Sequence, residues 1–208
     1  MVFVRCLLLF LLAMTIGVFG ASKPVEINKA AIVRLVDERT GRFFCSGTVV
    51  SDKIIITAAH CVGDALLGFP VSTRSYISVR DANNKELAIA TVHRFFLRTD
   101  QAMLTGDFSK LPKMELELSA EGAHDSLSSN LIACGYPYGE RLVCAKITNA
   151  THYGFFLMAT GYLFPGMSGG PVIDTATGKQ IAINYAVQEQ QVLLAPLVGI
   201  LSILESTL

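Results

Sequence analysis

The sequence predicts an all-β fold, either a sandwich or a barrel, and three observations point to it. Short runs rich in β-branched and aromatic residues recur from residue 30 to residue 200. Turns rich in Gly, Pro, Asn and Asp separate these runs at roughly 8–12-residue spacing, as in sandwiches and barrels. The chain has 208 residues, of which 51% are hydrophobic, so it can form one sizeable domain or two small ones that share an interface.

The first twenty residues, MVFVRCLLLFLLAMTIGVFG, have the layout of a secretory signal peptide. Arg5 gives a positive start, an apolar run follows from Cys6 to Phe19, and the small residues Val18 and Gly20 precede Ala21. This run is shorter than the ~20 residues that span a bilayer. The pattern predicts that residues 1–20 are removed from a secreted protein, and the alternative is an uncleaved membrane anchor.

The charge balance argues against a nucleic-acid partner. Lysine plus arginine total 17, and aspartate plus glutamate also total 17, so the formal net charge is zero. No basic field and no acidic tail stand out along the chain. We also expect no stable membrane association unless the signal segment is retained.

Strands and hairpins account for nearly all of the first half. A polar stretch with a proline then reads as a connector, and the predicted boundary between an N-terminal unit (21–115) and a C-terminal unit (116–208) lies there. In order, the predicted elements are a strand at 30–36, a hairpin at 42–59 around the turn SDK, a hairpin at 76–97 around DANNK, a strand at 100–106 and the connector at 108–126.

The second half repeats the same kind of pattern. Its last segment predicts a strand and a short C-terminal helix, with an apolar run too short and too interrupted to span a membrane. The predicted elements are a hairpin at 130–147, a strand within 154–164, two strands around a turn at 171–187, and the final strand and helix within 190–208.

Three short segments carry the residues for nucleophilic catalysis. His60 lies in TAAHC, Asp100 in DQAML and Ser168 in GMSGGP. A serine hydroxyl is a poor nucleophile at neutral pH, so it needs a base within hydrogen-bond reach, and the base needs a third group to fix its tautomer. Asp107 competes for that third role, but Asp100 is preferred because it alternates with Ala102 and Leu104 along one predicted strand.

The glycines around Ser168 fit the same chemistry. Acyl transfer builds negative charge on an oxygen atom, and the N–H groups of Gly166 and Ser168 could donate to that atom from a tight turn. Gly169 and Gly170 would let substrate and backbone approach closely. A purely structural turn is the alternative for this segment.

With TAAHC, DQAML and GMSGGPV in this order, residues 30–200 resemble the chymotrypsin-like (trypsin-like) serine proteases. PGMSGGPVIDTATGKQIAINYAV and LLAPL are most similar to the HtrA-type and related viral branch, without its PDZ module. The resemblance implies two packed antiparallel β-barrels with the site in the cleft between them. It also implies that His60 is the general base, that Asp100 orients it, that Ser168 attacks, and that Gly166 and Ser168 form the oxyanion hole.

Two departures from the animal digestive branch bear on activation. That branch has an aspartate before the nucleophile, where this chain has Met167, and an IVGG-like N-terminus that pairs with it, which is missing here. We therefore expect the site to form on folding, without activation by cleavage.

Substrate preference follows only in outline from the resemblance. It places Tyr162 at the floor of the S1 pocket, and no acidic residue lies between Tyr162 and Ser168, which disfavours cleavage after Arg or Lys. No histidine lies near Asn184, which argues against a pocket for acidic residues. We expect small or apolar P1 residues, with the strand edge at Asn184, Tyr185 and Ala186 pairing with the substrate backbone.

Four cysteines remain after the signal segment: Cys45, Cys61, Cys134 and Cys144. An even count behind an export signal suggests two disulfides, for which three pairings are possible. The resemblance implies a Cys45–Cys61 bridge, whereas a Cys134–Cys144 bridge rests only on the turn that the two residues flank. A zinc site is the weaker interpretation because the CxxC pairs of structural zinc sites are missing, so we expect no metal and no cofactor.

Taken together, these features predict a secreted serine endopeptidase that acts on peptide or protein substrates through a His–Asp–Ser triad and an acyl-enzyme. One alternative is a peptide-binding protein with the protease fold and little or no turnover. Another is an esterase that uses the same mechanism on small substrates.

Overall fold

The structure is a computed structural model that describes residues 25–64, 69–70, 76–117, 130–188, 190–197 and 200. The predicted signal peptide lies outside these residues, and so does the predicted C-terminal helix apart from Ile200, which is buried. In the described part of the chain, no helix has both the length and the apolar character needed to cross a membrane.

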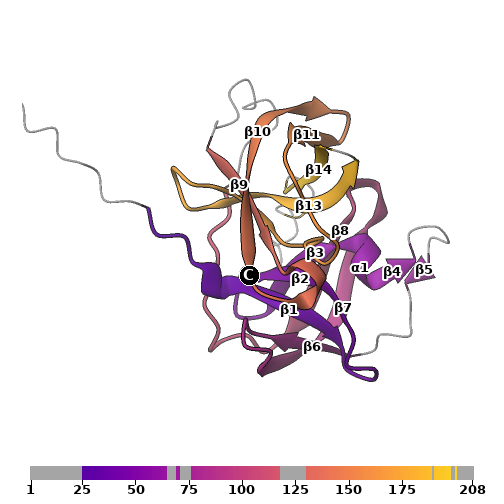
Figure 1. Ribbon diagram of the computed structural model, residues 1–208. Coiled ribbons are helices and arrows are strands. Elements are labelled where there is room, and N and C mark those ends of the chain that lie inside the picture. Colours follow the sequence, from indigo (N-terminus) through magenta and orange to yellow (C-terminus); the bar gives the residue numbers. More distant parts are fainter. Residues whose placement is uncertain are drawn as a thin grey trace, which may run out of the picture.

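Six strands of the first half close into an antiparallel barrel in the order β1-β2-β3-β8-β7-β6 (Figure 1). A short helix, α1, leaves β3, and two very short strands, β4 and β5, pair outside the barrel. The elements are η1 (Lys29–Ala31), β1 (Ile32–Asp37), β2 (Phe43–Val49), β3 (Ile54–Ala58), α1 (Ala59–Val62), β4 (Gly63–Asp64), β5 (Phe69–Pro70), β6 (Ile77–Arg80), β7 (Glu86–Phe96), η2 (Leu97–Thr99) and β8 (Gln101–Gly106).

The second half forms another closed antiparallel barrel, in the order β10-β11-β14-β13-β12-β9. Figure 1 shows its orange and yellow strands above the indigo and magenta strands of the first barrel. Its elements are β9 (Leu131–Gly135), η4 (Pro137–Gly139), β10 (Val143–Tyr153), β11 (Phe156–Thr160), β12 (Pro171–Asp174), β13 (Gln180–Gln188) and β14 (Gln191–Pro196). The prediction of two packed β-barrels is therefore confirmed.

Apolar side chains hold the barrels together. The core of the first barrel is built from the Ile- and Val-rich strands, and β3 is buried along its whole length. Ile183 and Ala195 of the second barrel belong to the same buried cluster. The barrels thus share a buried apolar contact, and burial of apolar area contributes roughly 25 cal/mol per Å² to its stability.

Both predicted disulfides are present. Cys45 of β2 is bonded to Cys61 of α1, and Cys134 of β9 is bonded to Cys144 of β10. The second bridge joins directly paired residues of the predicted hairpin.

One local expectation is wrong. Asp100 does not lie within a strand, because β8 begins at Gln101 and Asp100 is the left-handed residue that ends η2. Burial also does not separate the two faces of β8, since Gln101, Ala102, Met103 and Leu104 are all buried. The alternation argument that favoured Asp100 over Asp107 therefore fails, although Asp100 is the carboxylate beside His60.

The connector between the barrels begins after Gly106 and has no regular strand up to residue 117. Its first part is hydrogen-bonded to the first barrel, where Met114 N–H donates to the Val49 carbonyl. Its end lies along the second barrel, where Gln180 N–H donates to the Glu115 carbonyl and Glu117 N–H donates to the Gln180 carbonyl. The expected unit boundary near residue 116 stays a prediction.

Candidate active site

His60 stands at the end of β3, in the one-turn helix α1. Strand β3 is a buried Ile-rich segment that fixes the start of this turn, and the imidazole remains about one-third exposed (32%). The side chain is therefore held by a rigid strand and still reaches the surface.

Asp100 is bound to His60 through both of its carboxylate oxygens. Oδ2 lies 2.7 Å from His60 Nδ1, and Oδ1 accepts a 2.8 Å hydrogen bond from the His60 backbone N–H. The Asp100 backbone carbonyl also accepts from Ala59 N–H at 3.1 Å. The Asp100 side chain is only 7% exposed, so this pair of residues has one well-defined arrangement.

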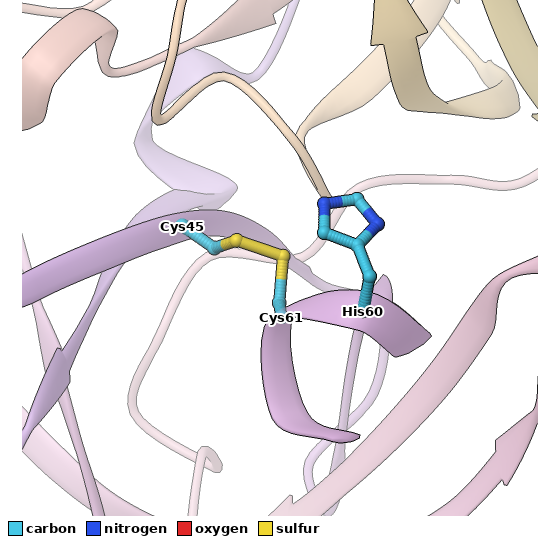
Figure 2. Close-up of side chains that lie close together, drawn as sticks. All are labelled: Cys45, His60 and Cys61. Carbon is cyan, nitrogen blue, oxygen red and sulfur yellow. A yellow bond between two sulfur atoms is a disulfide. The ribbon is translucent and has the colours of Figure 1, made fainter. Parts of the chain in front are cut away.

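The Cys45–Cys61 disulfide fixes the same turn from the other side. Figure 2 shows the bridge between the strand of Cys45 and the helix turn of Cys61, with the His60 imidazole beside it. Possible ligand atoms of these three residues lie within 4.8 Å of one another. Both sulfur atoms are used in the bridge and neither is a thiolate, so in this oxidised form the cluster offers a metal ion only the imidazole.

Residues 165–170 form a tight turn, here called the nucleophile turn, in which successive carbonyl groups have identified donors. Tyr138 N–H donates to the Pro165 carbonyl at 2.7 Å, and the Ser46 hydroxyl donates to the Gly166 carbonyl at 2.8 Å. The Met167 carbonyl accepts from the Gly170 N–H and from the Asn184 side-chain amide. The Ser168 carbonyl accepts from the Ser46 N–H at 2.9 Å.

Two N–H groups of the nucleophile turn are left without an acceptor. Within the described residues, neither Gly166 N–H nor Ser168 N–H donates a hydrogen bond. The Gly166 N–H shares a trans peptide with the Pro165 carbonyl, and the Ser168 N–H shares one with the Met167 carbonyl. Both carbonyls accept hydrogen bonds, so each N–H points away from the donor that binds the carbonyl of its peptide. The arrangement leaves two amide donors, two residues apart, available to an acceptor from outside.

Close contact brings the nucleophile turn against the histidine turn. A Cβ on Gly169 (φ +79°) would overlap Thr57 Oγ1 and the Ser46 carbonyl oxygen and lie 2.9 Å from Ala58 N. Only glycine therefore fits directly after Ser168. Two of the residues that it touches, Thr57 and Ala58, lie three and two positions before His60. Ser168 is partly exposed, and its hydroxyl forms no hydrogen bond within the described part of the chain.

The residues expected to bind substrate differ in their surroundings. Asn184 is fully buried, its side chain donates to the Cys134 and Met167 carbonyls, and its backbone is bonded to Gly169 and Gly170. Tyr162 is 56% exposed.

Tyr185 lies next to the histidine. Its ring centroid is 6.0 Å from that of His60, and the ring stacks on Phe156 at 4.8 Å. An aromatic wall thus stands beside the imidazole.

Ser46 is the residue of this site that sequence analysis missed. A small polar residue inside a predicted buried strand, directly after a bridged cysteine, is the signal that could have indicated it. Three of its hydrogen-bond partners, Tyr136, Gly166 and Ser168, are far away in the sequence, so nothing local pointed to them.

Comparison with known proteins identifies the family. A model described as the trypsin-like peptidase domain matches residues 45–183, which is more than half of the chain. The chain therefore belongs to the trypsin-like peptidase family, and it is a serine endopeptidase of that fold.

Similar solved structures agree on the fold. The serine endoprotease from Yersinia pestis has a TM-score of 0.67 and 22% identity over 88% of this chain and 66% of that chain. The active form of the Rv3671c protease from M. tuberculosis has a TM-score of 0.65 and 18% identity over 84% and 80%. The HtrA-type protease AlgW with a decapeptide has a TM-score of 0.64 and 20% identity over 85% and 64%.

Proposed function

We propose that this protein hydrolyses peptide bonds through a triad of His60, Asp100 and Ser168. The observation that carries the proposal is the pair of hydrogen bonds between Asp100 and His60, one to the ring Nδ1 and one to the backbone N–H. Such a carboxylate holds the imidazole with Nδ1 protonated, which leaves Nε2 free to accept a proton.

The reaction proceeds by acyl transfer. Ser168 Oγ attacks the scissile carbonyl carbon while its proton moves to His60 Nε2, and the charge that develops on the carbonyl oxygen is stabilised by the Gly166 and Ser168 N–H groups. His60 then gives the proton to the leaving amine as the C–N bond breaks. Water, activated by the same imidazole, hydrolyses the acyl-enzyme.

The edge of β13 is the proposed docking site for the substrate backbone. Pairing with β12 ends at Ile183, whereas pairing with β14 continues to Gln188. Tyr185, Ala186 and Val187 therefore have no partner strand on the β12 side within the described residues. A peptide can add there as a further strand, and the buried Asn184 fixes the nucleophile turn instead of binding the substrate.

Two further parts of the proposal concern specificity and location. The pocket before Ser168 accepts small or apolar P1 residues, since no acidic residue lies between Tyr162 and Ser168. The enzyme acts outside the cytoplasm, which agrees with its two disulfides and with the signal-like start of the chain.

Covalent labelling and peptide turnover test the catalytic proposal together. We expect a fluorophosphonate to label wild type at Ser168, and Ser168→Ala or His60→Ala to lower kcat by about 10⁶. The rate should fall in mild acid as His60 becomes protonated. Near-normal turnover by either folded variant would refute the triad.

A second candidate is a peptide-binding protein with little or no turnover. The observation in its favour is that the Ser168 hydroxyl forms no hydrogen bond to His60 within the described structure. This function predicts that folded wild type binds peptides with an apolar P1 residue, yet is not labelled by a fluorophosphonate under conditions that label trypsin.

A further inference from the structure

Ser46 is a fully buried polar residue at the junction of the two barrels. It lies in β2 directly after the bridged Cys45. Its Oγ donates to the Gly166 carbonyl at 2.8 Å and accepts from the Tyr136 N–H at 2.9 Å. Its own N–H donates to the Ser168 carbonyl at 2.9 Å. One residue of the first barrel therefore holds the second barrel's turn at two points, two residues apart.

We propose that Ser46 is a positioning residue that keeps the Gly166 and Ser168 N–H groups available to the substrate's carbonyl oxygen. The inference rests on the proposed function and adds a residue to it. Ser46 does not touch the substrate. It acts through the two carbonyl groups that it holds.

The Gly166 backbone explains why this turn needs an external support. Its φ of +96° is readily reached by glycine, but glycine also reaches many other conformations at little cost. Within the turn, the Met167 N–H donates to the Phe164 carbonyl. Among the residues that the structure describes, no group of the second barrel donates to the Gly166 carbonyl. The Ser46 hydroxyl supplies that donor. Without it, the Gly166–Met167 peptide is held only through the Met167 N–H, so its rotation, which would also turn the adjoining peptides that carry the Gly166 and Ser168 N–H groups, is less restrained.

The same strand also controls the base. Cys45 forms a disulfide with Cys61, which is adjacent to His60. Ser46 forms hydrogen bonds with the nucleophile turn. Two consecutive residues of β2 thus fix the backbone next to His60 and the backbone at Ser168. The Thr57 hydroxyl donates to the Ser46 carbonyl at 2.8 Å, which fixes β2 against the strand that carries His60.

Kinetics of Ser46→Ala test the inference. A turn that samples a second conformation is competent for part of the time, so kcat should fall about 10- to 100-fold, less than the 10²–10³ typical for loss of an oxyanion donor itself. KM should stay within about twofold, because the peptide docks on β13. The affinity for a peptide boronate, which mimics the tetrahedral intermediate, should fall by the same factor as kcat.

Thr48→Val is the matched control. Thr48 lies two residues further along β2, is equally buried, and has a hydroxyl without a hydrogen-bond partner within the described residues. We expect its kcat and boronate affinity to stay within about twofold of wild type. A general loosening of β2 would move both variants together, and that result would overturn the proposal.

Folding is monitored by thermal unfolding, since Ser46→Ala leaves the Tyr136 N–H without its acceptor. Ser46→Gly is the second variant if Ser46→Ala does not fold, because it removes the same hydroxyl without facing that N–H with a methyl group. Either folded variant that keeps kcat within twofold of wild type overturns the inference, as does a lower kcat with unchanged boronate affinity. Failure of the proposed function is distinct, because wild type itself would then neither turn over peptide nor be labelled.

Discussion

Asp100 has a backbone conformation that few side chains adopt. Its φ of 49° and ψ of 47° are left-handed, a region in which Asp and Asn are more frequent than other residues with a side chain. This conformation ends η2 and directs the carboxylate at both the ring and the backbone of His60. In this conformation the Asp100 side chain both orients the imidazole and holds the backbone of its turn.

Replacing this carboxylate by an amide should preserve the shape of the site and impair its chemistry. In Asp100→Asn, the amide can donate to Nδ1 and favour the wrong imidazole tautomer, so we expect kcat to fall about 10⁴-fold. Steady-state kinetics and thermal unfolding of wild type and variant provide the measurement. A folded variant with kcat within tenfold of wild type would contradict the role of Asp100.

Tyr136 should make stability depend on pH in the alkaline range. Burial raises the pKa of Tyr136 from 10.0 to about 12, and its hydroxyl donates to the Ile32 carbonyl at 3.0 Å. The folded state thus favours the protonated phenol, so this contribution is complete below pH 10 and is lost as the pH rises toward 12. The loss amounts to about 2 kcal/mol.

Urea unfolding of wild type and Tyr136→Phe across this range measures the effect. At neutral pH the variant should be less stable by about 1 kcal/mol, the usual value of one hydrogen bond. The difference should shrink above pH 10 and reverse near pH 12, because phenylalanine does not titrate. A constant difference across the range would contradict the assignment.

Among the elements, the nucleophile turn and β3 fit together only because Gly169 has no side chain. Its neighbours are backbone atoms and a buried hydroxyl in β2 and β3, which cannot move without shifting a strand. The contact is thus an element-to-element constraint: it sets how near the turn stands to the strand that carries His60.

Gly169→Ala and Gly154→Ala separate this contact from backbone strain alone. Both glycines have positive φ, but nothing lies within 4 Å of a Cβ at Gly154. We expect Gly154→Ala to cost about 1 kcal/mol in the free energy of unfolding from strain, and Gly169→Ala at least twice as much from strain plus overlap. Denaturant titration gives both values, and equal losses would show that the packing at Gly169 is unimportant.

The whole molecule is two barrels with a buried apolar interface, and the nucleophile turn bridges them. Met167, next to Ser168, is fully buried in the core of the second barrel, where a carboxylate would need a partner. The turn is held by Tyr138, Ser46 and Asn184, all of which are in place once the chain has folded. Among the described residues, no ion pair is part of this arrangement.

We therefore expect the activity not to depend on a free N-terminus at the predicted cleavage site before Ala21. We expect a chain that starts at Ala21 and one with a short Gly-Ser extension before Ala21 to have kcat/KM values within about twofold. Active-site titration corrects both for the folded fraction. A strong loss on extension would indicate activation through a free N-terminus and contradict the expectation drawn from Met167.

Sequence analysis predicted the hairpins and the Cys134–Cys144 bridge from turn residues and cysteine spacing, which are local features. The two packed barrels and the Cys45–Cys61 bridge came from the resemblance to the protease family, because local patterns left a sandwich and other cysteine pairings open. Sequence analysis also brought together His60, Asp100 and Ser168, although for Asp100 the strand-face argument was wrong and the motif context carried the choice. The role of Ser46 and the buried hydrogen bonds of Asn184 were not predicted, because Gly166 lies 120 residues from Ser46 and Cys134 lies 50 residues from Asn184 along the chain.

The sequence by itself determined the chemical groups of this protein and the strands that carry them, since hydrophobic period and turn chemistry act over a few residues. Only the tertiary structure decided which backbone groups stay free. Among the described residues, the Gly166 and Ser168 N–H groups have no acceptor, because hydrogen bonds from both barrels to the turn's carbonyl groups fix the orientation of its peptides. The two hydrogen bonds from Ser46 join the first barrel to the second, so they exist only after both barrels have closed and packed together.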